Sequence, residues 1–299
     1  MIKAEIVADS FNNLSGDRLT TFVVQFPRIV LAEFNTHRAL SRNSASSRAI
    51  PFEKMLEKVM TNPFIPIRWM KDHKGMQGNE FFEGLDDKQE LDAWWLGARD
   101  KAVAFAKDMS SFGVTKQFVN RLLEPFMWHT VIVTATEWEN FFALRAHPAA
   151  EIHIQKLADL MLEAYNKSTP KRLEAGEFHI PFGDNFDDDR ICRECGDKDD
   201  GTPYEEWLEQ RKIEIATARC ARVSYLNYEG NDDYAADIVL HDRLKDMGHW
   251  SPFEHCAKAM QKPAFSWQSG NFVGFDQYRK TFIGENKIDD RVIKVGTTK

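Results

Sequence analysis

The sequence predicts a mixed fold of the α+β class, in which many helices pack on strands. Three observations support this class. The chain has 299 residues, 43% of them hydrophobic, so it can bury a large core without disulfides or a structural metal. Runs of β-branched and aromatic residues indicate strands, and longer segments carry apolar residues at helical spacing. No Pro- and Ser-rich tether separates the halves, so we expect one domain over residues 1–299.

The first third of the chain predicts two strands, a polar loop and two helices. Residues 1–10 suit an opening strand, because Glu5 and Asp9 interrupt the apolar pattern of a signal peptide. Residues 20–38 predict a strand, a break at Pro27 and a short helical stretch that ends in His37 and Arg38. Residues 41–48 are expected to form a polar loop. Apolar residues at helical spacing then predict helices over 52–60 and 87–109, and we expect 62–112 to be a helical insertion.

The remainder alternates helices with one strong strand. Residues 115–124 look helical up to Pro125, which is expected to stop the helix. The β-branched run 128–135 is typical of a buried strand. An acidic, glycine-containing stretch over 182–203 predicts a loop insertion. Further helices are expected at these places: 151–166, 204–220 and 232–246.

Charge and composition exclude several classes of protein. The formal net charge of −7 argues against binding to long nucleic acid, whose phosphates attract basic surfaces. No apolar stretch approaches the roughly 20 residues of a membrane span, so we expect no membrane helix and a cytoplasmic location. The four cysteines do not form a disulfide framework, which fits a reducing compartment. Cys192 and Cys195 form a single C-x-x-C motif, for which we favour a solvated loop over a metal or redox site.

Common nucleotide and hydrolase motifs are absent from the sequence. It contains no G-x-G-x-x-G after a strand, no G-x-x-x-x-G-K-[ST], no H-E-x-x-H and no G-x-S-x-G. Rossmann dehydrogenases, P-loop enzymes, zincins and α/β-hydrolases are therefore disfavoured.

Three polar clusters could instead form a site for an anionic ligand. The first, THRALSRNSASSR at 36–48, offers arginines and hydroxyls that could hold phosphate, although it could equally be a solvated loop. The second includes Arg121 with Pro125, and Asn140 and Arg145 beyond the apolar run. The third is GHWSPFEH at 248–255, preceded by CARVSY at 220–225. His249 and Ser251 suit hydrogen bonding in a pocket better than metal binding, because no third ligand is apparent.

Together these clusters resemble the flavin-dependent thymidylate synthases, the ThyX family. That family carries Arg-His-Arg, seven residues and then Ser; here His37, Arg38, Ser46 and Arg48 match, whereas Thr36 replaces the first Arg. The segments around Arg121, Asn140 and Arg145 resemble the Arg-x-x-Leu-Pro and Asn-Phe-Leu-x-Leu-Arg motifs of the family. CARVSY and GHWSPFEH resemble its Ala-Arg-Val-Ser and Gly-His-x-[ST]-Pro-Phe-Glu-His motifs. These five motifs span about half of the chain.

The order of these motifs differs from that of the family. The last two motifs come first in the family, whereas here they follow the others, so the chain resembles a circular permutant. The segment 262–280 is similar to 25–38, which suggests a second copy of the strand and helix unit or else an ordinary terminal helix. Ser44 and Thr136 stand where many members have Glu and Arg.

The resemblance implies a twisted, mainly antiparallel sheet with packed helices, permuted connectivity and a helical insertion. It also implies reductive methylation of dUMP to dTMP, with 5,10-methylenetetrahydrofolate as carbon donor, FAD as hydride carrier and NADPH as reductant. Arg145 would be catalytic and would stabilise charge on the pyrimidine. The implied nucleotide contacts are Ser46, Arg48, Arg121, Arg145, Gln277 and Arg279, and the implied flavin or folate contacts are His37, Arg38, Asn140, His249 and Ser251.

The resemblance further implies a homotetramer without a resident metal and without a cysteine nucleophile. Two other functions stay open because of the substitutions at Thr36, Ser44 and Thr136. One is a related flavin- and folate-dependent enzyme that transfers a methyl or hydroxymethyl group to another pyrimidine nucleotide. The other is a binding protein that kept the fold and lost the activity.

Overall fold

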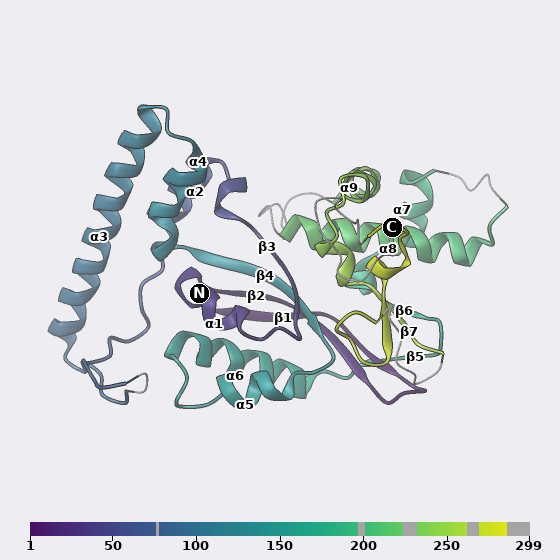
Figure 1. The fold of residues 1–299 in the computed structure, drawn as a ribbon, viewed down its shortest axis with the longest axis horizontal. Helices are drawn as coiled ribbons and strands as arrows, with labels where there is room; N and C mark the ends of the chain where they lie inside the picture. Colours follow the sequence, from purple (N-terminus) through teal and green to yellow (C-terminus); the bar gives the residue numbers. More distant parts are fainter. Residues whose placement is uncertain (76–77, 197–200, 224–231, 262–268, 286–299) are drawn as a thin grey trace, which may run out of the picture.

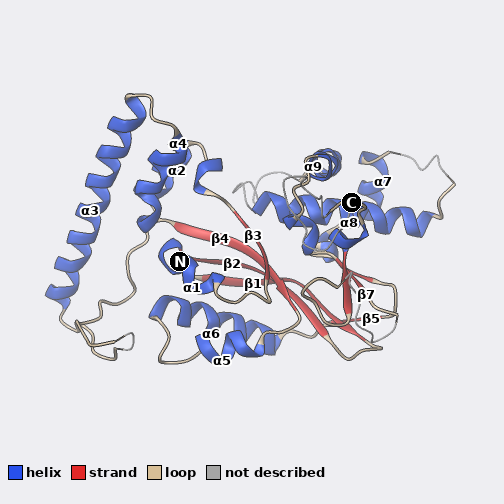
Figure 2. Cartoon of the chain, viewed as in Figure 1, coloured by secondary structure: helices blue, strands red, loops and turns tan. Residues whose placement is uncertain are grey.

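The computed structural model of the chain describes residues 1–75, 78–196, 201–223, 232–261 and 269–285. A long five-stranded sheet carries helices on both faces and at one end, and a smaller three-stranded sheet lies beyond its other end (Figures 1 and 2). The predicted α+β class is confirmed. The strands are β1 (Lys3–Asn12), β2 (Arg18–Pro27), β3 (Ser41–Ser44), β4 (Trp128–Ala135), β5 (Lys171–Leu173), β6 (Phe178–His179), β7 (Ala257–Ala259) and β8 (Phe275–Gln277).

Helices make up most of the remaining ordered structure. They are α1 (Leu31–Asn35), α2 (Phe52–Thr61), α3 (Leu85–Ser111), α4 (Lys116–Val119), α5 (Glu139–Arg145), α6 (Ile152–Lys167), α7 (Asp188–Glu194), α8 (Tyr204–Val223) and α9 (Tyr234–Asp246). None of these helices, in the part of the chain that the structure describes, combines the length and apolar character needed to cross a bilayer.

The large sheet has the strand order β3-β4-β2-β1-β5. Every neighbouring pair is antiparallel except β1 and β5, which run parallel, so the sheet is mainly antiparallel as the resemblance implies. Strand β1 contains an irregularity between Ile6 and Ala8, where the register against β2 shifts. The edge strand β3 pairs Ser41 with Thr134, and this edge carries the candidate site described below.

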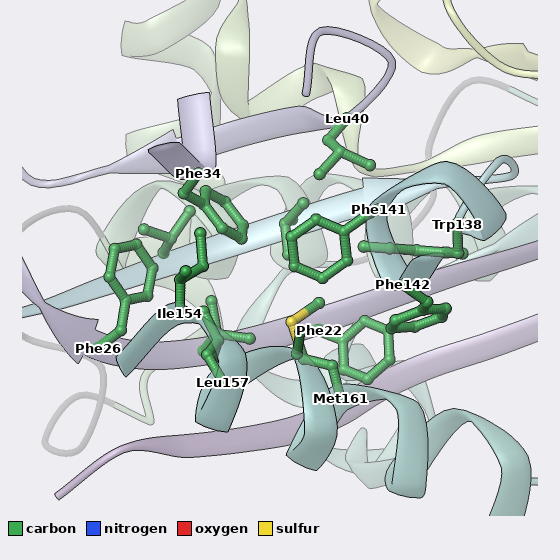
Figure 3. Packing of buried hydrophobic residues seen from close by; sticks show 14 of the residues in the cluster. Phe22, Phe26, Phe34, Leu40, Trp138, Phe141, Phe142, Ile154, Leu157 and Met161 are labelled. Carbon is green, nitrogen blue, oxygen red and sulfur yellow. The ribbon is translucent and has the colours of Figure 1, made fainter. Parts of the chain in front are cut away.

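The main core lies between the large sheet and helices α5 and α6. Alternate residues of β2 point toward these helices and are fully buried, because successive side chains of a strand lie on opposite faces. Figure 3 shows Phe22 and Phe26 among the aromatic rings of this cluster, with Leu157 and Met161 of α6 closing it from below. On the other sheet face, Val23 contacts the end of α8, so β2 is buried on both faces.

The segment predicted as a polar loop at 41–48 is a strand followed by a 3₁₀ turn. Residues Ser41–Ser44 form β3, and the 3₁₀ turn covers Ser47–Ala49. The local sequence has little strand propensity, but pairing with the exposed edge of β4 satisfies its backbone groups. The prediction of a loop over this segment was therefore wrong.

Two further local predictions require correction. Pro125 does not stop the helical segment before it; it lies inside a 3₁₀ stretch, Asn120–Phe126, that follows α4. A short 3₁₀ stretch tolerates proline because only one backbone donor is lost. Within the predicted acidic loop at 182–203, Asp188–Glu194 forms helix α7, since Asp187 caps it and Ile191 is buried. Residues 197–200 of that loop lie outside the described residues.

Helix α3 is part of the helical segment that the sequence predicts as an insertion. Its inner side packs Val103 and Ala106 against Met55 of α2 and Leu123 of the 3₁₀ stretch. These residues form a separate hydrophobic cluster at one end of the large sheet (Figure 1). The predicted segment therefore shares its core with residues on both sides of it in the sequence.

The second sheet and helices α8 and α9 form the other end of the molecule. Strand β7 pairs with β6 and β8 in antiparallel fashion. Asp237 of α9 is completely buried and accepts hydrogen bonds from Arg219 and Arg222 of α8, which holds the two helices together. Thus Arg222, the arginine of the CARVSY motif, forms a structural ion pair; Ser224 and Tyr225 of that motif lie outside the described residues.

A buried chain of hydrogen bonds joins the two sheets. His179 of β6 contacts Ser10 of β1 through Nδ1 and Thr21 of β2 through Nε2, each at 2.8 Å. Thr21 contacts Thr134 of β4 at 2.7 Å, and Thr134 contacts Nδ1 of His255 at 2.8 Å. Burial lowers the pKa of both histidines to about 3, so both rings are neutral at pH 7.

Candidate functional site

The edge strand β3 is the element on which the three polar clusters of the sequence meet. It follows the segment of His37 and Arg38, and it contacts α8 and the 3₁₀ turn Ser251–Glu254 on its outer side. Residues that are about 200 positions apart in the sequence therefore become neighbours here. The motifs therefore lie together in space although they are far apart in the sequence.

Arg145 is held by two residues of the first cluster. Its Nε donates to Nε2 of His37 at 2.9 Å, and its Nη2 donates to the hydroxyl of Thr36 at 3.0 Å. Burial, followed by the nearby guanidinium groups of Arg145 and Arg42, lowers the pKa of His37, so its Nε2 accepts a hydrogen bond while the ring is neutral. The edge of the His37 ring also packs against Phe141 of the same helix as Arg145. Hydrogen bonds to His37 and Thr36 thus fix the orientation of the Arg145 guanidinium group.

Arg42 connects this group to the third cluster. It donates to the backbone oxygen of Phe34, and burial lowers its pKa while the charge of Glu254 opposes that shift. Glu254 in turn accepts a hydrogen bond from Arg279 at 2.5 Å, and Arg279 also bonds Glu285. These carboxylates raise the pKa of Arg279 although its partial burial opposes the charge. Arg279 is paired with two carboxylates, whereas Arg42 and Arg145 form no ion pair within the described residues. These two cations favour an anionic ligand.

Asn43 of β3 links the C-terminal part of the chain to the large sheet through two hydrogen bonds. Its Nδ2 donates to the backbone oxygen of Cys220 at 3.0 Å, and its Oδ1 accepts from the hydroxyl of Ser251 at 3.1 Å. Ser251 itself is exposed. A predicted flavin contact is therefore positioned by a strand residue from the opposite end of the sequence.

Gln277 of β8 belongs to a buried group of polar side chains that contacts β3. Only 2% of its surface is exposed. Its Nε2 donates to Oδ1 of Asn271 at 2.7 Å and to the hydroxyl of Ser41 at 3.2 Å, and Asn271 donates to the backbone oxygen of Ala39. This arrangement supports the loop after α1, and the predicted nucleotide contact of Gln277 stays a prediction.

The other predicted nucleotide contacts lie on an open surface near the start of α2. Ser46, Arg48 and Arg121 are all exposed. Asn120, next to Arg121, donates through Nδ2 to the backbone oxygens of Ser47 and Ile50, which brings the two segments together. The Oδ1 atom of Asn120 is buried and has no hydrogen-bond partner among the described residues.

The remaining predicted cofactor contacts are also exposed. They are Arg38, Asn140 and His249. A cavity of about 280 Å³ lies between α2 and the large sheet, but none of the predicted site residues lines it. Arg38, Asn140 and His249 therefore lie on the surface, outside this cavity.

The cysteines take no part in this surface. Cys192 contacts the hydroxyl of Tyr204 at 3.2 Å, and burial raises the pKa of Cys195 to about 11. Burial likewise raises the pKa of Cys220, and it raises that of Cys256 to about 12, which suppresses their thiolate forms. Within the described ranges, no group of three or more His, Cys, Asp and Glu side chains could hold a metal ion.

Several residues of the site are not among the sequence predictions. Arg42, Asn43 and Glu254 lie inside the quoted motifs, so their position between matched residues is a signal that could have identified them. Glu33 also has such a signal, because it stands one turn before His37; its Oε2 is buried and has no partner in the part of the chain that the structure describes. Asn271 has no comparable signal, since only the fold brings it to Ser41.

Comparison with known proteins gives one family match and a set of weak structural matches. The model of the Thy1 family, described as thymidylate synthase complementing protein, matches residues 19–171. No curated protein sequence matches. Among solved structures, a UMP/dUMP methylase PolB from Streptomyces cacaoi bound with 5-Br UMP is 16% identical, with a TM-score of 0.46 over 56% of this chain and 89% of that chain. The same methylase bound with 5-Br dUMP gives a TM-score of 0.44 at 16% identity, over 56% of this chain and 91% of that chain.

Proposed function

Because this chain belongs to the Thy1 family of thymidylate synthase complementing proteins, we propose that it methylates dUMP to dTMP by a flavin-dependent route. In this proposal 5,10-methylenetetrahydrofolate donates the carbon, FAD carries the hydride and NADPH supplies the reducing equivalents. The observation that carries the proposal is the group of Arg145, His37 and Thr36, which lies on the same edge of the sheet as Arg42 and Ser251.

The residues along β3 fit a flavin dinucleotide by the chemistry of their donors. Arg38 and Arg42 offer charge-assisted hydrogen bonds for a pyrophosphate, and Asn140 and Ser251 offer neutral donors. Bound there, the flavin would supply hydride transfer. Thr36 contributes no positive charge where the family has arginine, so the neighbouring arginines would carry more of the phosphate binding.

The nucleotide is proposed to bind beside the flavin, with Arg145 facing the pyrimidine. Two of the five N–H groups of Arg145 bond His37 and Thr36, which leaves three with no protein acceptor within the described residues. A fixed cation at this position stabilises the negative charge that builds up on the ring when C5 becomes nucleophilic. Because His37 is neutral, it orients Arg145 without adding a competing charge.

The phosphate and sugar are proposed to contact the exposed surface around α2. Ser46, Arg48 and Arg121 supply a hydroxyl and two cations for the phosphate. Asn120 joins the segments of Ser46, Arg48 and Arg121 by donating to the backbone oxygens of Ser47 and Ile50. Arg279 would act on this ligand through Glu254, to which it is bonded.

Mass spectrometry of the recovered nucleotide tests the proposed reaction. Protein loaded with FAD is incubated without oxygen with dUMP, methylenetetrahydrofolate and NADPH. A methyl gain on dUMP that is absent with the Arg145→Ala variant supports the proposal. Unaltered dUMP with flavin-loaded protein contradicts it; the same assay with dCMP, and a search for hydroxymethyl products, then tests the related transfer reactions.

A further inference from the structure

Arg42 lies on the opposite face of β3 from the residues that attach this strand to the C-terminal part of the chain. Successive side chains of a strand point to opposite faces. Ser41 and Asn43 bond residues from the C-terminal part of the chain. Arg42 instead pairs with Val133, whose side chain belongs to the main core under α5 and α6. The side chain of Arg42 therefore lies on the sheet face that carries α5.

Arg42 and Arg145 contact the same short segment of the chain. Nη1 of Arg42 donates to the backbone oxygen of Phe34 at 3.2 Å. Arg145 donates to the side chains of Thr36 and His37, which follow Phe34 closely in the sequence. This segment is the last part of α1 and the turn after it. Two guanidinium groups from different elements, β3 and α5, therefore lie around one turn of the chain.

Phe141 of α5 fixes the position of this turn. The rings of Phe34 and His37 both pack against it, with centroid distances of 5.8 Å and 5.0 Å. Figure 3 shows Phe34 and Phe141 next to each other in the main core. Arg145 lies about one helical turn after Phe141. Burial, and then the charges of Arg145 and Arg42, lower the pKa of His37, so both cations act on this one ring.

Neither of these two partly buried arginines has a counter-ion among the described residues. Arg42 and Arg145 donate to a backbone oxygen and to neutral side chains, whereas Arg279 bonds two carboxylates. Glu254, whose charge acts on Arg42, is one of those two carboxylates and is bonded to Arg279. Removing a cation from water without a counter-ion costs free energy. Two such cations at one turn therefore favour an anionic ligand.

Arg42 carries positive charge close to a position where charge is missing. Thr36 is exposed and uncharged, whereas the ThyX family has arginine there. Guanidinium groups match phosphate oxygens through charge-assisted hydrogen bonds that are often bidentate. We propose that Arg42 binds a phosphate group of the ligand beside Arg145, and that it supplies from β3 the positive charge that Thr36 lacks. This inference rests on the proposed function, which provides two sources of that phosphate, the flavin dinucleotide and the nucleotide.

Ligand pairs that differ by their phosphate groups test the role of Arg42. Isothermal titration measures the binding of FAD and riboflavin, and of dUMP and deoxyuridine, to the full chain. Arg42→Gln is expected to weaken binding of the phosphate-bearing ligand by about 10- to 100-fold, as the loss of a charge-assisted hydrogen bond does. Binding of the phosphate-free ligand should stay unchanged, so the pair that shows the difference identifies the source of the phosphate. Arg243→Gln, at an exposed position of α9, is the control, and circular dichroism verifies that both variants fold.

A positive charge moved to position 36 tests the second part of the proposal. The Arg42→Gln/Thr36→Arg variant should bind the phosphate-bearing ligand at least ~10-fold more tightly than Arg42→Gln/Thr36→Gln. The second variant is the matched control, because it carries a long neutral side chain at the same exposed position. Equal affinities of these two variants overturn the replacement of a charge at position 36 by Arg42.

The outcomes separate the role of Arg42 from the proposed reaction. A loss in Arg42→Gln that depends on phosphate, without a methyl gain on dUMP in the wild type, supports the role of Arg42 and contradicts the reaction. Wild-type affinity of Arg42→Gln for both FAD and dUMP, or equal losses for ligands with and without phosphate, overturns the role of Arg42 and leaves the reaction standing. A wild type that binds neither FAD nor dUMP contradicts both.

Discussion

At the scale of single residues, the contacts of Arg145 show what threonine does at position 36, where the family has arginine. Thr36 stands where the ThyX family has arginine, and its hydroxyl accepts a hydrogen bond from Nη2 of Arg145. An arginine at that position would bring a second guanidinium toward Arg145, whereas threonine supplies an acceptor. His37 fixes the other side of the guanidinium, so its orientation depends on two neutral acceptors.

Removal of Arg145 should separate its chemical role from a structural one. Arg145→Ala is expected to lower turnover of dUMP by at least ~100-fold, as losses of transition-state charge stabilisation do, with an unchanged circular dichroism spectrum. The pKa of His37 should rise at the same time, because the charge of Arg145 contributes to lowering it; NMR titration measures this shift. Arg243→Ala, at an exposed position of α9, serves as the control. Full activity of Arg145→Ala would refute the catalytic role.

At the scale of elements, the sequence predicts what depends on local periodicity and misses what depends on pairing between distant segments. Strand β4 occupies 128–135 as predicted, and α6 begins and ends within one residue of its prediction, because buried runs and apolar spacing are local signals. Strand β3 could not be predicted, since SRNS becomes a strand only by pairing with β4. Likewise, the motifs indicate His37, Arg145 and Ser251, but only the fold supplies Asn271 and the role of Asn43.

Strand β3 should depend on Asn43 for its attachment to the C-terminal elements. Asn43→Ala leaves the oxygen of Cys220 and the hydroxyl of Ser251 without this partner, which is expected to cost about 1–3 kcal/mol of unfolding free energy. Urea denaturation measures the loss, and retention of flavin on a desalting column measures the effect on the site. Ser44→Ala in the same strand is the control. Equal behaviour of the two variants would exclude the proposed attachment.

Helix α3 should gain stability from one added methyl group. Gly97→Ala is expected to stabilise the protein by about 1 kcal/mol, since alanine is the better helix former and the added Cβ meets no atom of the described residues. Thermal denaturation measures the gain. An unchanged or lower melting temperature would contradict this expectation.

At the scale of the whole molecule, the region matched by the Thy1 family and the region beyond it share one site and one buried polar chain. The match ends at residue 171, whereas Ser251 and His255 bond to residues of β3 and β4 inside it. These contacts hold the motif segments against the same sheet although they lie far apart in the sequence. The circular permutation stays a prediction.

The stability of the whole molecule should fall as the medium becomes mildly acidic. Burial lowers the pKa of His129, His179 and His255 to about 3 each, with nearby Arg28 contributing at His129, whereas an unfolded histidine titrates at about 6.5. Below about pH 6.5 these histidines therefore bind protons in the unfolded state but not in the folded state. For each of these histidines the unfolding free energy should decrease as the pH falls, with a slope that approaches about 1.4 kcal/mol per pH unit near pH 5, where carboxylates begin to contribute.

Urea denaturation between about pH 7 and pH 5 measures this slope. His255→Gln removes one of the three imidazoles whose pKa burial lowers to about 3. It should reduce the slope by up to about one third, because His37 and His241, whose pKa burial also lowers, add to the slope. His73→Gln, whose ring is exposed to water, is the control and should keep the wild-type slope. A slope that His255→Gln leaves unchanged would contradict a buried neutral ring at this position.

The hydrogen bonds that join the two sheets also have a direction. A neutral imidazole carries one N–H, so if Ser10 donates to His179, each following bond must point the same way until His255 holds its hydrogen on Nε2. If the bonds run in the opposite direction, Nε2 of His255 is a bare acceptor. With every hydroxyl hydrogen used, these are the two tautomeric states of the chain. The Nε2 atom of His255, four residues after Ser251, has no partner within the described ranges of the chain. The hydroxyl orientation of Ser10 on β1 therefore decides whether this atom is a donor or an acceptor.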